Sequence, residues 1–209
     1  MTTTCLPTLP FAHLNLRFNP FGEMELSDRA TLAIVDVDEV LNNIKQNPRV
    51  AIQFMGDKGR GKTTHLLALK QHFPDAAYLH VPEDTTPKRI PHGVPLFLDE
   101  TQRIPRWRRR LVFRRNVPLI IGTHENHEAE LRRAGRDVQT IFPGESTDAD
   151  RLNQIIEHRI EWSRRSPGRV PRVRRETINA MLRRFGDDVR AIEHELYETF
   201  QQLTENTDV

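Results

Sequence analysis

Cysteine and long apolar runs are the features that this sequence of 209 residues most clearly lacks. The single cysteine, Cys5, has no partner within the chain, so a disulfide framework is excluded and a reducing compartment is favoured. No apolar run approaches the roughly 18 residues that a membrane-spanning helix needs. The N-terminal residues also lack the charged and apolar regions of a signal peptide. We therefore expect a soluble, cytoplasmic protein with no membrane contact.

Lysine is also scarce, and arginine greatly outnumbers it in a chain whose net charge is only +2. Guanidinium groups favour phosphate and carboxylate partners because their planar fork matches both anions. The arginines gather in segments 103–115 and 164–175, and the first of these holds seven arginines with Trp107 among them. This pattern leaves three interpretations open for segment 103–115: a nucleic-acid contact, an acidic protein interface or a solvated face.

Apolar runs that stop at glycine or polar residues predict five strands, in segments 49–56, 76–81, 94–100, 117–124 and 137–144. Helical spacing of apolar residues predicts helices between and after them, in segments 27–47 (one broken helix or a pair), 62–73, 127–135, 146–165, 175–186 and 187–203. Residues 82–93 are rich in proline and leave little room for a helix, and Pro105 interrupts a partly helical segment that reaches Arg115.

The order of these elements predicts an α/β fold with a parallel five-stranded sheet flanked by helices, followed by a small α-helical lid. We expect three parts, namely an N-terminal arm (1–22), an α/β domain that holds the sheet (23–144) and a helical lid domain (145–209).

The segment GDKGRGKTTH, residues 56–65, fits the pattern G-x-x-x-x-G-K-[ST] between a predicted strand and a predicted helix. Glycine lets the backbone wrap closely around phosphate oxygens, and successive N–H groups at a helix N-terminus form an anion nest. Lys62 can bridge the β- and γ-phosphates, and the Thr63 hydroxyl can ligate Mg²⁺. The predicted phosphate-binding residues are Gly56, Asp57, Lys58, Gly59, Arg60, Gly61, Lys62, Thr63 and Thr64.

Two acidic residues, Asp99 and Glu100, end the third predicted strand. Asp99 can hold the Mg²⁺ shell together with Thr63, and Glu100 can orient or deprotonate the attacking water. An Asn-Lys-x-Asp element for guanine is absent from the sequence, which favours adenine. The predicted ligands are therefore ATP and Mg²⁺. A further metal site at His124 and His127 is not supported by a strong zinc spacing.

The order of these motifs resembles the AAA+ ATPases, and in particular compact forms of the origin-recognition, clamp-loader and transposition type. The resemblance rests on the loop at 56–63, the Asp99–Glu100 pair, LIIGTH at 119–124, RLNQIIEHRI at 151–160 and GDDVRAIEHEL at 186–196. It implies that Thr123 or His124 senses the γ-phosphate and that Arg190 couples the lid to the nucleotide. The brief NPFG segment at 19–22 is similar to leaders of bacterial ATPases that contact adenine.

The segment LRRAGRDVQTIFPG, residues 131–144, is similar to the stretch of this family that presents arginine fingers to a neighbouring subunit. The resemblance implies a finger at Arg133 or Arg136 and a homo-oligomer on ATP binding. We therefore expect an Mg²⁺-dependent ATPase whose lid and core change angle and act on a protein client or a nucleic acid. The alternative is an ATP-regulated DNA-binding regulator or adaptor with negligible hydrolysis.

Overall fold

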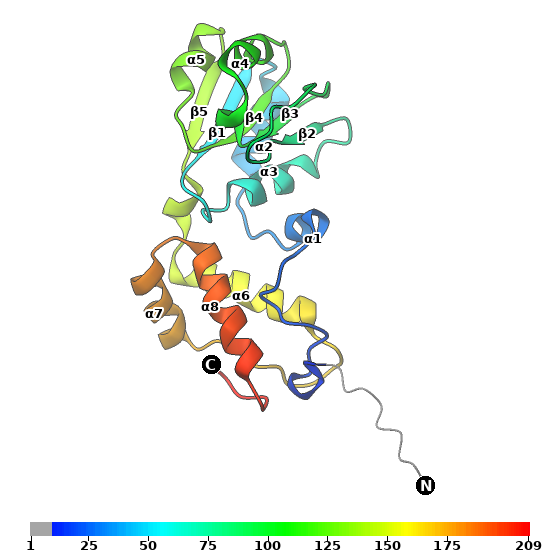
Figure 1. Cartoon of the computed structure of the whole chain (residues 1–209), viewed down its shortest axis with the longest axis vertical. Coiled ribbons are helices and arrows are strands. Elements are labelled where there is room, and N and C mark those ends of the chain that lie inside the picture. The colour runs from blue at the N-terminus through cyan, green and yellow to red at the C-terminus, as the bar shows by residue number, and fades with distance from the viewer. Residues whose placement is uncertain (1–9) are drawn as a thin grey trace. The chain divides into compact units, whose positions relative to one another are not determined.

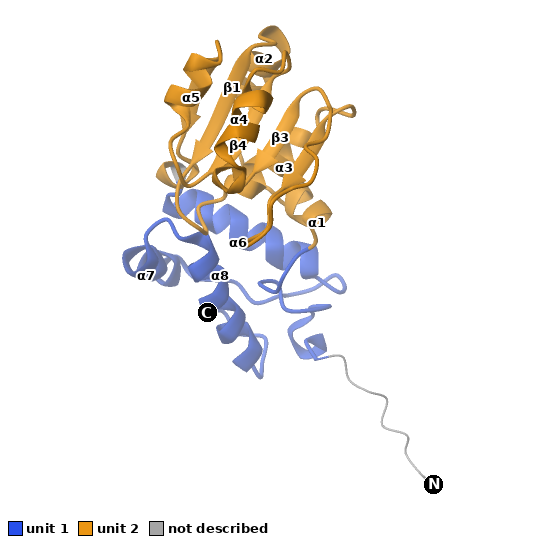
Figure 2. Ribbon diagram, turned by 45° about the horizontal axis from the view of Figure 1, so that its top comes forward, with its two compact units in different colours: residues 1–24, 147–209 blue, residues 25–146 orange. Residues whose placement is uncertain are grey.

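The computed structural model describes residues 10–209, which form two compact units (Figure 2). The first contains the described residues up to Met24 together with Thr147–Val209, and the second contains Glu25–Ser146. Cys5 and the first part of the predicted arm lie outside the described residues.

The second unit is built on a five-stranded, all-parallel sheet, which confirms the predicted α/β architecture. The strands lie in the order β2-β3-β4-β1-β5. Their bounds are β1 Val50–Met55, β2 Ala77–His80, β3 Leu96–Asp99, β4 Leu119–Thr123 and β5 Asp137–Ile141. Since β1 lies between β4 and β5, the loop that follows it leaves an interior strand and not an edge strand.

Helices cover both faces of this sheet (Figure 1). The helices of the unit are α1 Leu26–Thr31, α2 Asp38–Gln46, α3 Lys62–Lys70, α4 Arg106–Phe113 and α5 Glu128–Arg133. Alternate residues along each strand face opposite sides. On β4, Ile120 packs in one core with Leu41 and Leu66 from α2 and α3, whereas Ile121 packs in the other with Val112 and Leu131 from α4 and α5.

The structure resolves three local expectations. The segment predicted as one broken helix or a helix pair is a pair, α1 and α2, and residues 82–93 contain no helix. Pro105 interrupts the partly helical segment as predicted, since it separates a short 3₁₀ turn, Thr101–Arg103, from α4, of which it is the N-cap. Proline fits at this boundary because the first helical N–H groups need no intrahelical partner.

The first unit contains the three helices predicted after Gly144, as α6 Ala149–Ser163, α7 Arg175–Phe185 and α8 Val189–Gln202. The described part of the predicted arm also belongs to this unit. It includes a short 3₁₀ turn, Ala12–Leu14, and buries Leu14, Leu16 and Phe21 among the helices. Phe21 meets Phe200 of α8 edge to face, with 5.0 Å between ring centroids. Residues 10–24 therefore contribute to the core of this unit.

Among residues 10–209, no helix has both the length and the apolar composition required to cross a membrane.

Candidate phosphate and cation site

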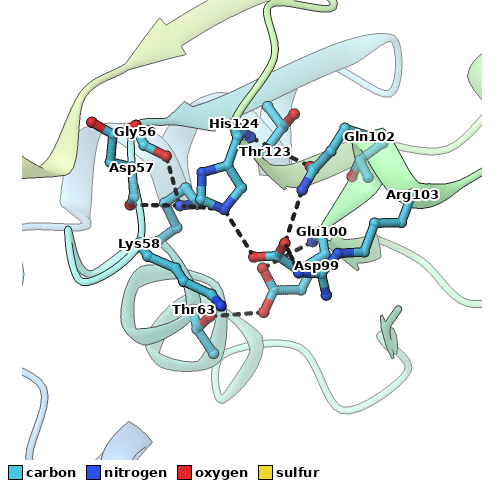
Figure 3. Close-up of polar contacts among 12 residues, drawn as sticks. Gly56, Asp57, Lys58, Thr63, Asp99, Glu100, Gln102, Arg103, Thr123 and His124 are labelled. Atoms are coloured by element: carbon cyan, nitrogen blue, oxygen red, sulfur yellow. Dashed lines mark hydrogen bonds and ion pairs between the residues drawn. The ribbon is translucent and has the colours of Figure 1, made fainter. Parts of the chain in front are cut away.

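The carboxyl ends of three neighbouring strands and the N-terminus of α3 meet at one edge of the sheet (Figure 3). The crevice outside the carboxyl ends of parallel strands is where open α/β sheets bind ligands. Here β1 leads into the loop 56–61, β3 ends at Asp99, and β4 ends at Thr123. The two sequence motifs predicted to act together, the loop at 56–63 and the acidic pair, are thus brought to the same edge.

The loop 56–61 has a backbone conformation that requires glycine. Gly59 and Gly61 have φ angles of 87° and 80°, in the left-handed region that other residues rarely adopt. Gly61 is the N-cap of α3, so the first N–H groups of that helix open toward the loop. The curled main chain therefore offers a cluster of donors at the positive end of a helix dipole.

Lys62, the first residue of α3, is only 5% exposed and its ammonium group lies over the loop. Lys62 Nζ donates to the carbonyl oxygens of Gly56 at 2.7 Å and Asp57 at 2.8 Å, and lies 3.4 Å from His124 Nε2. The charge is thereby held inside the curl of the loop, where an anion enclosed by the loop would meet it.

Thr63 and Asp99 are in direct contact. The Thr63 hydroxyl donates to Asp99 Oδ2 at 2.7 Å, although 36 positions separate the two residues in sequence. Asp99 is fully buried, and its other oxygen accepts the backbone N–H of Glu100 at 3.1 Å. A hydroxyl and a carboxylate paired in this way offer the hard oxygen ligands that Mg²⁺ prefers.

Two residues of β2 that were not expected at the site also hold Asp99. Tyr78 donates its hydroxyl to Asp99 Oδ2 at 3.1 Å, and His80 Nδ1 lies 3.2 Å from the same oxygen. Burial, and next the charge of Asp99, raise the pKa of Tyr78 well above its usual value, so this phenol stays protonated and can donate. The sequence signal was the spacing of Tyr78 and His80, which puts both on one face of the strand.

Gly122 of β4 packs closely against Asp99. A β-carbon at this position would lie 2.6 Å from Asp99 Oδ1 and 3.1 Å from Leu66 Cδ1. The backbone of β4 therefore approaches the carboxylate as closely as a residue without a side chain allows.

Glu100 is held by three polar side chains. Its Oε2 accepts from Gln102 Nε2 at 2.8 Å and pairs with Arg103 at 3.0 Å, and its Oε1 lies 3.4 Å from His124 Nε2. Its backbone has a φ angle of 61°, which is uncommon outside glycine and turns the carboxylate at the strand end. Such strained conformations cluster at functional sites.

The structure separates the two candidates at the end of β4. Thr123 is fully buried, and its hydroxyl donates to the carbonyl of Glu125 at 2.9 Å and accepts that residue's N–H at 3.0 Å. The Thr123 side chain thus organises its own turn. His124 instead lies between Lys62 and Glu100, so it is the member of the pair that faces the loop.

The remaining predicted loop residues differ in their exposure. Lys58 is exposed and pairs with Glu83 at 3.0 Å, and Glu83 in turn pairs with Arg103 at 2.9 Å. The bond from Lys58 lowers the pKa of Glu83. Arg60 and Thr64 are half-buried. A chain of opposite charges thus connects the tip of the loop to Arg103, which holds Glu100.

The predicted arginine fingers have contrasting surroundings. Arg136 is 5% exposed and donates to the backbone carbonyls of Phe113 at 2.8 Å, Val117 and Arg115. Burial, with a smaller contribution from Arg49, lowers the pKa of Arg136 to about 10. This guanidinium fastens the segment between α4 and β4 and is not presented to a second molecule. Arg133, at the end of α5, is exposed.

Arg190 belongs to the helical unit, where it is exposed near the start of α8. The NPFG segment belongs to the same unit, and Phe18, Pro20 and Gly22 line a small pocket there with Trp162.

The residues at this edge fit a triphosphate and a magnesium ion. The loop supplies backbone donors and Lys62 supplies a cation, while Thr63 and Asp99 supply paired oxygens. Among residues 10–209 there is no group of three or more His, Cys, Asp or Glu side chains suited to a metal ion, so an ion here would take its other ligands from phosphate and water.

No family model and no curated protein matches this chain.

Proposed function

We propose that this protein is an Mg²⁺-dependent ATPase of the AAA+ type, in which the loop 56–63 is a P-loop. One observation carries the proposal: the hydrogen bond of 2.7 Å between Thr63 and Asp99. It joins the residue that follows the loop lysine to the acidic strand end, which is the pairing that P-loop chemistry requires for a cation beside bound phosphates. A glycine turn of purely structural character would not need this partner.

Each residue then has a role that follows from its position. The loop amides and Lys62 bind the phosphates, and Lys62 exchanges its bonds to the Gly56 and Asp57 carbonyls for phosphate oxygens. Bound Mg²⁺ would offset phosphate charge, and Thr63 and Asp99 would hold it. His124 senses the γ-phosphate.

Glu100 accepts a proton from the attacking water. The new bond forms between the water oxygen and the γ-phosphorus, and the bond to the β,γ-bridging oxygen breaks. The products are ADP and phosphate.

The helical unit is proposed to act as the lid, with Arg190 as its nucleotide-sensing residue. ATP binding would also favour a homo-oligomer, and the exposed Arg133 is a better candidate than the buried Arg136 for the charge that one subunit offers to the next. Light scattering with and without ATP tests this assembly, and Arg133→Ala should weaken it while Arg190→Ala should change turnover without changing the mass. An equal mass with and without ATP would contradict the assembly.

A second candidate function is a nucleotide-regulated adaptor that binds ATP and hydrolyses it negligibly. The specific observation that favours it is the set of three contacts on Glu100, from Gln102, Arg103 and His124. These contacts occupy the carboxylate oxygens and compete with an attacking water for them. In this case ATP would serve as a switch, and partner binding rather than turnover would be the output.

Calorimetry with ATP and Mg²⁺ tests the proposal, followed by phosphate release from the same samples. Wild type should bind and turn over ATP, Lys62→Ala should fail to bind, and Glu100→Gln should bind without turnover. Lys45→Ala is the matched control because Lys45 is an exposed lysine of α2, outside the site. Binding without turnover by wild type would favour the adaptor, and no heat with ATP would reject both functions.

A further inference from the structure

The arginine-rich segment 103–115 divides into two sets once the side-chain contacts are known. Four of its arginines bond to backbone carbonyls or carboxylates of neighbouring segments of the same unit. They are Arg103, bonded to Val81 and Glu83; Arg108, bonded to Pro87; Arg109, bonded to Glu130, Gln102 and Ile104; and Arg115, bonded to Pro91 and Ile90. These four fasten the loop between β2 and β3 and the neighbouring α5. They are not available to a partner.

The outward set lies along α4, which packs beside α5 (Figure 1). Trp107 and Leu111 are 60% and 61% exposed, more than any other large hydrophobic side chain in the described part of the chain. They are four residues apart, so they are neighbours on one helix face. Arg110 and Arg114, the C-cap of the helix, are exposed three positions after Trp107 and Leu111, so they lie beside them on the same face. We call Trp107, Leu111, Arg110 and Arg114 the α4 face.

The indole of Trp107 is held in place before any partner arrives. The guanidinium of Arg108 lies 4.9 Å from its ring centre, and Arg108 is itself bonded to the carbonyl of Pro87. One side of the ring is therefore covered and the other is open. A side chain that is already fixed loses less conformational entropy on binding. Tryptophan and arginine are also the residues that most often dominate the energetics of protein interfaces.

We propose that the α4 face binds an acidic amphipathic segment of a partner protein. Apolar side chains of the segment cover Trp107 and Leu111, and its carboxylates pair with Arg110 and Arg114. This inference stands on the α4 face alone and does not depend on nucleotide binding.

A nucleic acid fits the same face less well. Leu111 has no ring on which a base can stack, although it is as exposed as Trp107. Arg106, the other exposed arginine of α4, is paired with Glu130 at 3.3 Å, so part of the positive charge is already neutralised from α5. The charge and the apolar pair together match carboxylates beside aliphatic groups better than a line of phosphates.

The full-length protein is titrated into three fluorescent probes, and anisotropy reports binding. The first is a synthetic 18-residue helical peptide with leucines on one face and glutamates on the other. The second has lysines in place of the glutamates, and the third is a 20-nucleotide poly-dT strand. Trp107→Ala and the pair Arg110→Glu/Arg114→Glu change the face. Leu26→Ala and Lys45→Glu are the controls, since these residues are exposed on α1 and α2 of the same unit.

The acidic peptide should bind with saturation. Each change to the α4 face should weaken it at least tenfold, and the controls should change it less than twofold. The lysine peptide should not bind. The proposal is overturned if the acidic peptide does not bind, or if the controls weaken it as much as the face variants. Binding of poly-dT that Arg110→Glu/Arg114→Glu abolishes, without binding of the acidic peptide, would reassign the face to nucleic acid. Circular dichroism checks that each variant is folded.

Discussion

Replacing Gly122 with alanine tests whether close packing of β4 fixes Asp99. The added β-carbon would lie 2.6 Å from Asp99 Oδ1, closer than real β-carbons approach other atoms. Asp99 cannot move aside freely, because its Oδ2 is bonded to Thr63, Tyr78 and His80. Overpacking of a filled core and the loss of a charged hydrogen bond together cost about 2–4 kcal/mol of unfolding free energy.

For a chain of this size that loss lowers the melting temperature by about 4–16 °C, which differential scanning calorimetry measures. A displaced Asp99 should also raise the Mg²⁺ concentration needed for half-maximal nucleotide binding. Gly22→Ala is the control, since its β-carbon would meet no atom closer than 3.5 Å, and it should stay within about 1 kcal/mol of wild type. If Gly122→Ala melts like wild type and shows the same Mg²⁺ dependence, the reasoning is refuted. Lower stability with an unchanged Mg²⁺ dependence would keep the packing argument and reject Asp99 as the cation-binding group.

Three further predictions concern other buried or half-buried polar groups. Tyr78→Phe should cost about 1 kcal/mol and raise the Mg²⁺ midpoint, because it removes one bond to Asp99; an unchanged midpoint in a Mg²⁺ titration would contradict the role of Tyr78. Arg136→Ala should cost more than about 3 kcal/mol in denaturant unfolding, since three backbone carbonyls lose their donor, whereas Arg133→Ala should stay within about 0.5 kcal/mol; equal effects would refute this distinction. Burial, followed by the charge of Arg109, lowers the pKa of His127, so the ring is neutral in the native state. The native state is therefore most stable above the ordinary pKa of histidine, and it loses stability as pH falls below that value and protonation becomes favourable in the unfolded chain. His127→Gln should flatten the decline of unfolding free energy between about pH 7 and pH 5, and a parallel decline would contradict it.

The parts of the fold that the sequence predicts well are those encoded locally. The strand β1, the glycines of the loop and the start of α3 follow one another within a single stretch, so pattern and turn chemistry were sufficient. The acidic pair at the end of β3 could be recognised for the same reason. The parallel sheet followed from the alternation of strands and helices.

The contribution of β2 could not be predicted, because it depends on pairing between distant strands. The register of β2 with β3 puts His80 opposite Asp99, and Tyr78 lies two positions earlier on the same face. No local pattern states which strand will be the neighbour of which. The order of the strands across the sheet, and not a sequence motif, brings these two side chains to the carboxylate of Asp99.

The arginine spacing at 133–136 shows the opposite difficulty. It matches a pattern of exposed charges, yet Arg136 is buried. The carbonyls of Phe113, Arg115 and Val117, in the segment that connects α4 to β4, need hydrogen-bond donors, and Arg136 supplies them. Burial depends on the whole unit, so sequence spacing alone could not distinguish Arg136 from the exposed Arg133. The same holds for Thr123 and His124, which are adjacent in sequence but point to different partners.

The helical unit is discontinuous in sequence, since residues 10–24 contribute Leu14, Leu16 and Phe21 to a core whose other members come from residues after 147. During synthesis on the ribosome, all of residues 25–146 emerge before that core can close. The sheet unit can therefore fold first. Residues 10–24 can pack into their core only after α8, with Phe200, has been synthesised.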